Sequence, residues 1–267
     1  MMNLPLSDIL PCGVCEFSKV GELIPCRAQS RIPENAKSVI MYLFPYFLGE
    51  DFYENSNISK YAVPADYHII ADRYLEKACQ ELQNLYPENK FSRFCDNSPI
   101  REVEVAVLCG LGVKGRNGLL INEKYGSFCF IGEIITDKEI TASVPEDRTC
   151  VGCGICEKKC PLGAISGYKV DASKCLSHIT QKKGELSQEE RKCIEEIGCI
   201  WGCDICQNVC PMNKNIEVTP IVEFIETAKS RFNKGDNIED RAFNWRGRAV
   251  IERNFEINCC KDKENKL

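Results

Sequence analysis

Two runs of cysteine carry the clearest chemistry in this sequence. The first has the spacing Cys-x2-Cys-x2-Cys-x3-Cys-Pro and extends from Cys150 to Pro161, and the second, Cys-x2-Cys-x3-Cys-Pro, extends from Cys203 to Pro211. The first spacing is the one with which bacterial ferredoxins bind iron–sulfur cubanes, and zinc sites seldom use it. A pair of such runs therefore predicts two [4Fe–4S] clusters.

The cysteines can be divided between the clusters from the direction of the chain. Cys160 is followed by Pro161, which turns the chain toward the other cluster. The first cluster is assigned Cys150, Cys153, Cys156 and Cys210. The second is assigned Cys160, Cys203 and Cys206, and it lacks one thiolate. Cys175 is the candidate for that position, with Cys193 and Cys199 as alternatives.

Apart from its cysteines, the composition is that of an ordinary folded protein, with 44% hydrophobic and 27% charged residues. Nineteen cysteines in 267 residues would suggest disulfides in a short secreted chain, but the N-terminus has no signal-peptide pattern. No run of about eighteen apolar residues predicts a membrane helix. We therefore expect a cytoplasmic protein with no membrane partner. The net charge of −5 argues against a surface coated for nucleic acid.

The elements that must position these groups alternate between strand and helix patterns. Asp66 to Leu85 has helical spacing, and a second helix is expected from Pro99 to Leu108 because proline favours the first helical turn. Apolar runs predict strands at 38–44, 91–95, 118–121 and 127–136. This mixture predicts an α+β protein whose first part is an α/β sandwich.

Three features ahead of the cysteine runs have competing interpretations. His68 suits a ligand or acid–base role as well as a solvated position in the first helical turn. Asp96 is favoured on spacing alone as a turn or helix-capping residue. The glycine-rich loop from Gly110 to Asn117 matches GxGxxG literally but follows a helix, so it does not predict a dinucleotide site. Close approach to a cofactor and a loop between packed elements are equally good explanations.

Composition shifts divide the chain into residues 1–145, 146–215 and 216–267. The first part also holds Cys12, Cys15 and Cys26, and the Cys12–Cys15 pair is interpreted as packing residues rather than as a metal or redox pair. The last part mixes basic and aromatic residues, as nucleic-acid surfaces do. A short, solvated, amphipathic helical tail is the favoured interpretation.

Several phrases in the chain together resemble the epoxyqueuosine reductase family, which completes the queuosine modification of tRNA and is related to corrinoid reductive dehalogenases. The resemblance covers roughly residues 36–255. The matching phrases are Tyr61-Ala62, Asp66-Tyr67-His68, Asp96-Asn97-Ser98-Pro99, Gly110-Leu111-Gly112, Gly115-Arg116-Asn117-Gly118-Leu119-Leu120-Ile121, Tyr125-Gly126-Ser127, Gly132-Glu133-Ile134-Ile135-Thr136-Asp137, Cys175-Leu176-Ser177 and Gly202-Cys203-Asp204-Ile205-Cys206-Gln207.

The resemblance implies a cobalamin-binding domain at 1–145, a ferredoxin-like domain with two [4Fe–4S] clusters at 146–215 and a helical tail at 216–267. It implies that Cys175 completes the second cluster. It also replaces the capping interpretation of Asp96 with that of a general acid, for which a raised pKa is expected. It implies cobalamin contacts from Tyr61, Ala62, His68, Asn117, Ser177 and Asp204.

The implied reaction is cobalamin-dependent reduction of epoxyqueuosine to queuosine in tRNA. Its electrons would come from a low-potential donor such as ferredoxin or flavodoxin. The alternatives are reduction of another small electrophile, as in dehalogenases, and electron transfer or corrinoid handling without a substrate. The chain departs from the family at Arg116, where lysine is common, and at Val63-Pro64-Ala65. It also lacks the C-terminal helical repeats with which many members hold tRNA, so it resembles a short form.

Overall fold

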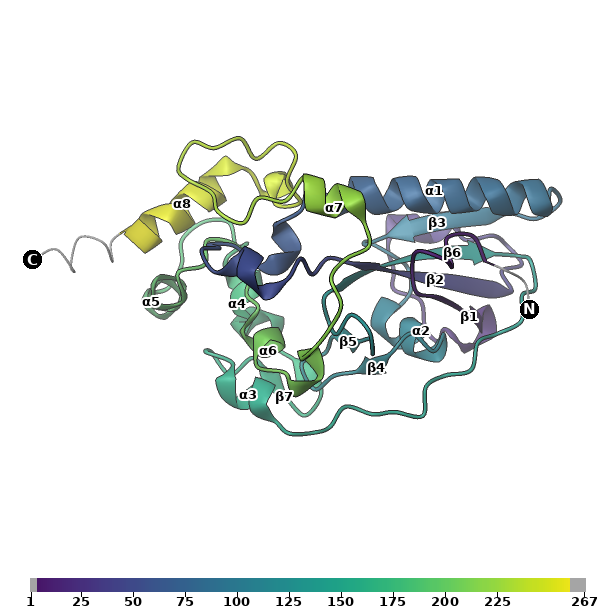
Figure 1. Ribbon diagram of the computed structural model, residues 1–267, viewed down its shortest axis with the longest axis horizontal. Coiled ribbons are helices and arrows are strands. Elements are labelled where there is room, and N and C mark those ends of the chain that lie inside the picture. Colours follow the sequence, from purple (N-terminus) through teal and green to yellow (C-terminus); the bar gives the residue numbers. More distant parts are fainter. Residues whose placement is uncertain (1–3, 260–267) are drawn as a thin grey trace, which may run out of the picture.

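The computed structural model describes residues 4–259 and is built around one four-stranded antiparallel sheet. In spatial order the strands are β1 (Cys12–Glu16), β2 (Ser38–Pro45), β6 (Cys129–Thr136) and β3 (Phe91–Cys95) (Figure 1). The strands expected near 38–44, 91–95 and 127–136 are therefore present. The α+β fold class is confirmed.

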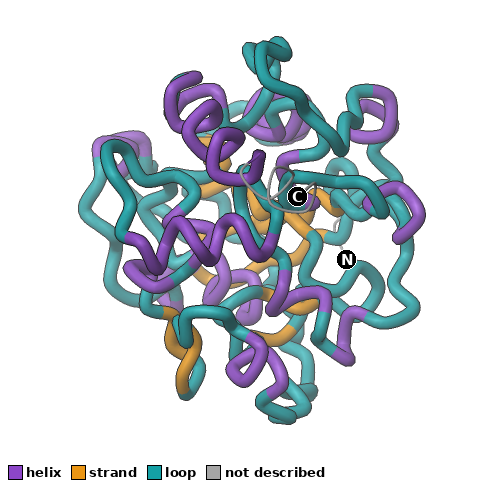
Figure 2. Tube along the Cα trace, turned by 90° about the vertical axis from the view of Figure 1, so that its left-hand side faces the viewer, coloured by secondary structure: helices purple, strands orange, loops and turns teal. Residues whose placement is uncertain are grey.

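Strand β2 is apolar throughout because both of its faces are covered. Ile40, Tyr42 and Phe44 lie in the core that α1 (Tyr67–Leu85) covers. Val39, Met41 and Leu43 alternate with them and lie in the opposite core, against α2 (Glu102–Leu108). Side chains of a strand point alternately to its two faces, so one continuous apolar run serves both cores. Figure 2 shows helices and loops surrounding the central strands.

The two helices differ in how well the sequence locates them. Helix α1 begins where expected, with the Asp66 carboxylate accepting a hydrogen bond from the His68 N–H. Helix α2 begins at Glu102, three residues after Pro99. Asp96 and Asn97 have φ values of 57° and 46°, which are left-handed rather than those of a helix cap. The capping interpretation of Asp96 is therefore wrong.

The glycine-rich loop is a small hairpin formed by β4 (Val113–Lys114) and β5 (Leu120–Ile121). The strand expected at 118–121 is shorter than expected. A Cβ on Gly112 would lie 2.5 Å from the Ile121 carbonyl oxygen, and one on Gly110 would lie 2.5 Å from the Val144 carbonyl oxygen. Close packing of the protein's own backbone therefore explains these two glycines.

The cysteine-rich part consists of short elements joined by loops. Helix α5 has a capping box between Ser187 and Glu190 and ends at Gly198 in a left-handed conformation. The elements in this part are α3 (Ile155–Lys159), β7 (Ile165–Ser166), β8 (Lys169–Val170), α4 (Leu176–Ile179), α5 (Gln188–Ile197) and α6 (Ile205–Asn208). The 3₁₀ turns within the described residues are η1 (Phe17–Lys19), η2 (Arg27–Arg31), η3 (Glu50–Tyr53), η4 (Lys60–Ala62), η5 (Ala172–Lys174), η6 (Pro211–Asn213) and η7 (Asn244–Arg246).

The C-terminal part is packed into a core that it shares with residues 58–63 and Trp201, and it is not a solvated tail. Between α7 (Val222–Glu226) and α8 (Arg248–Cys259) the chain is mostly irregular. Phe232 and Phe243 are 1% and 0% exposed and share a core with Trp201. These two aromatic rings are therefore not available to stack on bases. Among the described residues, no helix is both long enough and apolar enough to cross a bilayer.

Candidate functional site

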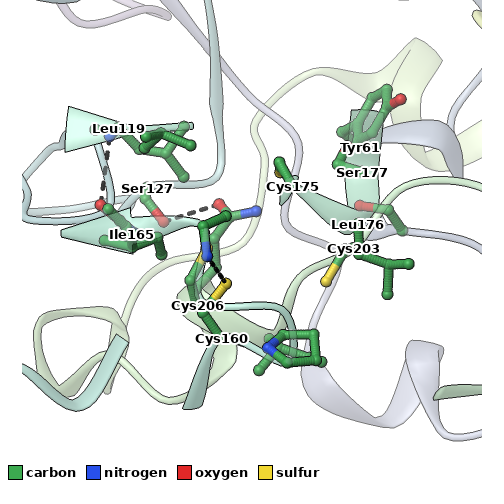
Figure 3. Close-up of a pocket in the computed structure, with 18 of the residues that line it drawn as sticks. Tyr61, Leu119, Ser127, Cys160, Ile165, Cys175, Leu176, Ser177, Cys203 and Cys206 are labelled. Carbon is green, nitrogen blue, oxygen red and sulfur yellow. Dashed lines mark hydrogen bonds between the residues drawn. The ribbon is translucent and has the colours of Figure 1, made fainter. Parts of the chain in front are cut away.

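A cavity of about 470 Å³ lies where the end of the sheet meets the cysteine-rich loops. The sheet side contributes Tyr46, Tyr67 and Phe130, and the β4–β5 hairpin contributes Asn117, Gly118 and Leu119. Figure 3 shows Leu119 and Ser127 on one side of the cavity and Tyr61, Leu176 and Ser177 on the other. Cavities of this size and mainly apolar character are typical of cofactor sites.

Four cysteine side chains line this cavity together: Cys160, Cys175, Cys203 and Cys206 (Figure 3). They are the set assigned to the second cluster, and they include Cys175. Of the two alternatives, Cys193 is buried in the core of α4 and α5. The Cys199 thiol donates a hydrogen bond to the Trp201 carbonyl oxygen at 3.1 Å. Neither alternative lines the cavity.

The other four assigned cysteines line a second, small cavity nearer the surface: Cys150, Cys153, Cys156 and Cys210. Cys153 is exposed and Cys156 is buried. Arg116 and Asn117 also line this cavity, and Asn117 belongs to the wall of the large cavity as well. The two groups of four thiols therefore lie on either side of the segment that carries Asn117.

The thiols of the inner group are surrounded by protein. Burial raises the pKa of Cys203 and of Cys206 to about 12. Such thiols keep their protons at neutral pH, and iron must displace these protons when a cluster forms. Within residues 4–259, no three histidine, cysteine, aspartate or glutamate side chains converge closely enough to bind a single metal ion.

Asp96 lies at the centre of a hydrogen-bonded chain of side chains. Its Oδ2 accepts a hydrogen bond from the Tyr67 hydroxyl at 3.0 Å and lies 3.2 Å from His68 Nε2. His68 Nδ1 lies 2.6 Å from Asp66 Oδ1. The Tyr67 ring stacks on His68 and on Phe130, with ring centroids 4.0 and 3.8 Å apart.

This chain of contacts holds a proton on His68. Burial lowers the pKa of His68, but its hydrogen bonds to Asp66 and Asp96 outweigh burial and raise the pKa to about 9. The hydrogen bond from His68 is also the main reason that the pKa of Asp96 is lowered to about 2. At neutral pH the pair is an imidazolium and a carboxylate. The raised pKa expected for Asp96 is therefore not found in this arrangement.

Asp96 also marks the border between two cavities. Together with Asn97, Arg101 and Lys114 it lines an open cavity of about 560 Å³. Gly118 lines both this open cavity and the cavity that contains the inner thiols. The Asp96 carboxylate thus faces the open cavity and is hydrogen-bonded to Tyr67 in the wall of the inner cavity.

The six residues expected to contact cobalamin are divided by the structure. Tyr61, Asn117 and Ser177 line the inner cavity. His68 and Asp204 do not line it. His68 contacts Asp96, and Asp204 accepts hydrogen bonds from the Ser59 hydroxyl at 2.5 Å and the Lys60 N–H at 2.6 Å. The contact expected from Ala62 is wrong, because Ala62 is fully buried in the core that contains Trp201 and does not line the cavity.

Sequence reasoning did not single out several residues of the cavity wall. Tyr67, Ser127 and Gln207 lie within the matched phrases, yet their role emerges only when the chain folds. The Ser127 hydroxyl donates a hydrogen bond to Gln207 Oε1 at 2.9 Å, which ties the sheet side to α6. Cys129 is a fifth cysteine of the wall, and no spacing pattern in the sequence distinguishes it.

Comparisons with known proteins agree with this site. Residues 149–213 match the family model of a 4Fe-4S double cluster binding domain, and residues 27–97 match that of epoxyqueuosine reductase QueG (DUF1730). The chain is 33% identical to the epoxyqueuosine reductase of Lactococcus garvieae over 76% of this chain and 61% of the relative. It is 35% identical to that of Leadbetterella byssophila over 80% of this chain and 71% of the relative.

Solved structures extend the comparison to the fold. Epoxyqueuosine reductase from Streptococcus thermophilus superposes with a TM-score of 0.78 at 26% identity, covering 95% of this chain and 78% of that one. An epoxyqueuosine reductase with a tRNA-Tyr stem loop gives 0.79 at 22% identity, covering 94% and 78%. A reductive dehalogenase described as B12-dependent shares the fold more distantly, with a TM-score of 0.51 at 15% identity over 92% of this chain and 34% of that one.

The resemblance seen in the sequence is thus confirmed by family models, relatives and fold. The chain spans about 61% of the length of the Lactococcus relative. The 149–213 segment is a double [4Fe–4S] cluster domain, and the eight cysteines assigned to the two clusters lie within it. The chain belongs to the epoxyqueuosine reductase family.

Proposed function

We propose that this chain is a cobalamin-dependent reductase that converts epoxyqueuosine in tRNA to queuosine. One observation carries the proposal: the Asp96 carboxylate lines an open cavity and accepts a hydrogen bond from Tyr67, whose side chain lines the cavity with the four cluster thiols. Family membership supports the reaction, and one solved family member has an epoxyqueuosine-modified tRNA stem loop bound.

The inner cavity fits a corrinoid. Leu119, Phe130 and Ile165 offer apolar contact, while the Ser177 hydroxyl and the Gln207 amide offer hydrogen bonds to the amide groups at the edge of a corrin ring. The Asn117 side-chain nitrogen is buried without a hydrogen-bond partner in the part of the chain that the structure describes. An amide without a partner in a cavity wall is costly unless a bound group satisfies it. When bound there, cobalamin supplies reduction at its cobalt, with the clusters as the source of electrons.

The side chains around Asp96 supply the first proton of the reaction, and solvent that reaches the open cavity supplies the second. Removing the epoxide oxygen as water needs two electrons and two protons. His68 holds a proton at neutral pH and lies within hydrogen-bond reach of Asp96. A substrate that covers the exposed Asp96 carboxylate would remove water from it and raise its pKa, which favours transfer of the proton from His68 to Asp96. Asp96 then donates the proton to the substrate oxygen, and Tyr67 holds the carboxylate in position.

Reconstitution tests this proposal. Anaerobically purified protein with both clusters is titrated with cob(II)alamin and then reduced in the presence of tRNA that carries epoxyqueuosine. We expect a change in the cobalamin spectrum on binding and conversion to queuosine, measured by mass spectrometry of the digested nucleosides. Cobalamin binding with an unchanged tRNA base would reject the substrate and favour a small electrophile. A cluster spectrum that does not respond to cobalamin would reject the proposal as a whole.

A further inference from the structure

The two groups of cluster thiols differ in their access to solvent. The inner thiols line the inner cavity, whereas the outer group includes the exposed Cys153 at the surface. Helix α3, which carries Cys156, lies at the lower edge of the molecule in Figure 1. An electron that reaches the inner cavity through both clusters therefore enters at the outer one.

The loop around the outer thiols presents bare backbone and apolar side chains. Val151 is 61% exposed and Ile155 is 38% exposed. Gly152 and Gly154 are left-handed, with φ values of 66° and 69°, and a Cβ on either would meet no atom closer than 3.9 Å. Gly152 is exposed and Gly154 is half-buried beside the Glu157 side chain. The loop is thus an open surface with a small apolar centre.

Positive charge flanks this apolar centre. Lys158 and Lys159 end α3, and both are exposed. Within residues 4–259, no carboxylate lies within ion-pair distance of either lysine. The nearby Glu157 carboxylate is neutralised by Arg116 at 2.8 Å. The lysine charge therefore remains available to a partner, in a chain whose net charge is −5.

We propose that this surface, formed by Val151, Gly152, Cys153, Ile155, Lys158 and Lys159, is the docking site of a small acidic redox protein of low potential. The inference rests on the proposed function, because that reaction needs two electrons from outside. In each encounter the reduced centre of the donor loses one electron and the outer cluster gains it, with no bond made or broken. Two encounters supply one turnover. Small, partly apolar interfaces with complementary charge are typical of transient electron-transfer complexes.

Stopped-flow reduction of the clusters tests the docking site. The donor is a pre-reduced, acidic two-iron ferredoxin, and the variant is Lys158→Glu with Lys159→Glu. At low ionic strength we expect the second-order rate constant to fall by about tenfold or more, with a weaker salt dependence, because steering by charge is lost. Reduction by dithionite, a small reagent that needs no docking, should keep its rate.

A matched control places the same charge change elsewhere. Arg73 and Lys77 are exposed residues of α1, on the far side of the molecule from α3 in Figure 1. Arg73→Glu with Lys77→Glu should leave the ferredoxin rate within about twofold of the unaltered protein. An equal loss in both variants, or no loss in the α3 variant, would overturn the docking site.

A binding readout separates docking from catalysis. Carbodiimide joins lysine amines to carboxylates that they touch, and we expect cross-links from the ferredoxin to Lys158 or Lys159, identified by mass spectrometry. Cross-links confined to other lysines would contradict the proposal. Lysine-dependent cluster reduction in a protein that leaves epoxyqueuosine unchanged would reject the proposed function and keep the docking site.

Discussion

The sheet part and the cysteine-rich part of this protein are stabilised in different ways. The sheet part has long strands with apolar cores on both faces, in which Val39, Ile40 and Leu43 are fully buried. The cysteine-rich part has helices of four to ten residues and a core of six buried residues: Leu176, Ile179, Leu186, Cys193, Ile194 and Ile257. Two iron–sulfur clusters cross-link its loops where apolar packing is scarce.

The two parts also differ in the chemical groups that they carry. The part with the sparse core carries the cluster cysteines, and the part with the dense core carries Asp96, the proposed proton donor, just after β3. Iron binding is a source of folding free energy for the sparse part. None of the eight assigned cluster cysteines lies in the cores of the sheet part, so we expect it to position Asp96 and His68 without metal.

Removal of iron should produce the largest difference in local stability between the two parts. Chelation should cost the 150–210 segment about 3 kcal/mol or more of local stability, because metal binding there is also folding free energy. Hydrogen exchange followed by mass spectrometry measures the effect by segment. Amides of β2 and β6 should keep their protection. Equal loss in both parts would show that the sheet depends on the clusters.

A buried carboxyl offers a sharper test of the sheet part. Glu133 is 0% exposed, burial raises its pKa, and its Oε1 is hydrogen-bonded to the Ser98 hydroxyl beside Asp96. Ser98→Ala leaves this carboxyl without that partner and should lower the free energy of unfolding by about 2 kcal/mol in a denaturant titration. The partly exposed Ser92, hydrogen-bonded to the Arg31 carbonyl oxygen, is the control. Ser92→Ala should cost less than about 0.5 kcal/mol, and equal costs would refute the argument.

A substitution at Gly118 tests the wall of the inner cavity, where the sheet part meets the cysteine-rich part. Its φ is 80°, and a Cβ there would lie 3.0 Å from Val170 Cγ2 at the edge of the inner cavity. Gly118→Ala should cost about 1–2 kcal/mol in stability for its left-handed backbone and weaken cobalamin binding about tenfold, or about 1.4 kcal/mol. Gly163 has a φ of 61° and open space around it, so Gly163→Ala shares only the backbone cost. Similar cobalamin affinities in the two variants would show that Gly118 does not contact the cofactor.

The pH dependence of stability tests the proton that His68 holds. The pKa of His68 is about 9 in the folded protein and about 6.5 when the side chain is free. The folded state thus binds this proton more tightly, so the stabilisation is complete below about pH 6.5 and is lost as the pH rises through about 9. Denaturant titrations of the unaltered protein and of His68→Gln should therefore converge at high pH. A constant difference between them would contradict the proton assignment.

Much of the fold could be predicted because local patterns determine it. The apolar run at Ser38–Pro45, the helical spacing after Asp66 and the cysteine spacings each needed only neighbouring residues. Strand β1 was not predicted, because Cys12–Glu16 is short and pairs with a distant strand. The φ values of Asp96 and Asn97 escaped prediction as well, since the buried hydrogen bond from Ser98 to Glu133 of β6 holds that turn.

The site could be predicted only where it depends on local sequence patterns. Spacing alone could not choose among Cys175, Cys193 and Cys199, and the resemblance to a family pointed to the cysteine that lines the cavity. The lowered pKa of Asp96 depends on His68, twenty-eight residues earlier, and no sequence pattern reports that contact. The cluster ligands and the roles of individual cavity residues stay predictions for spectroscopy and mutagenesis.

We propose that electrons reach the cavity from the clusters on one side and that the proton reaches it from Asp96 on the other. Single-turnover kinetics of Asp96→Asn, with clusters, cobalamin and epoxyqueuosine-modified tRNA, separates the two deliveries. The account predicts reduction of the bound cobalamin at the unaltered rate, seen in its visible spectrum, with queuosine formation slowed by about a hundredfold or more. Queuosine formation at the unaltered rate would contradict it.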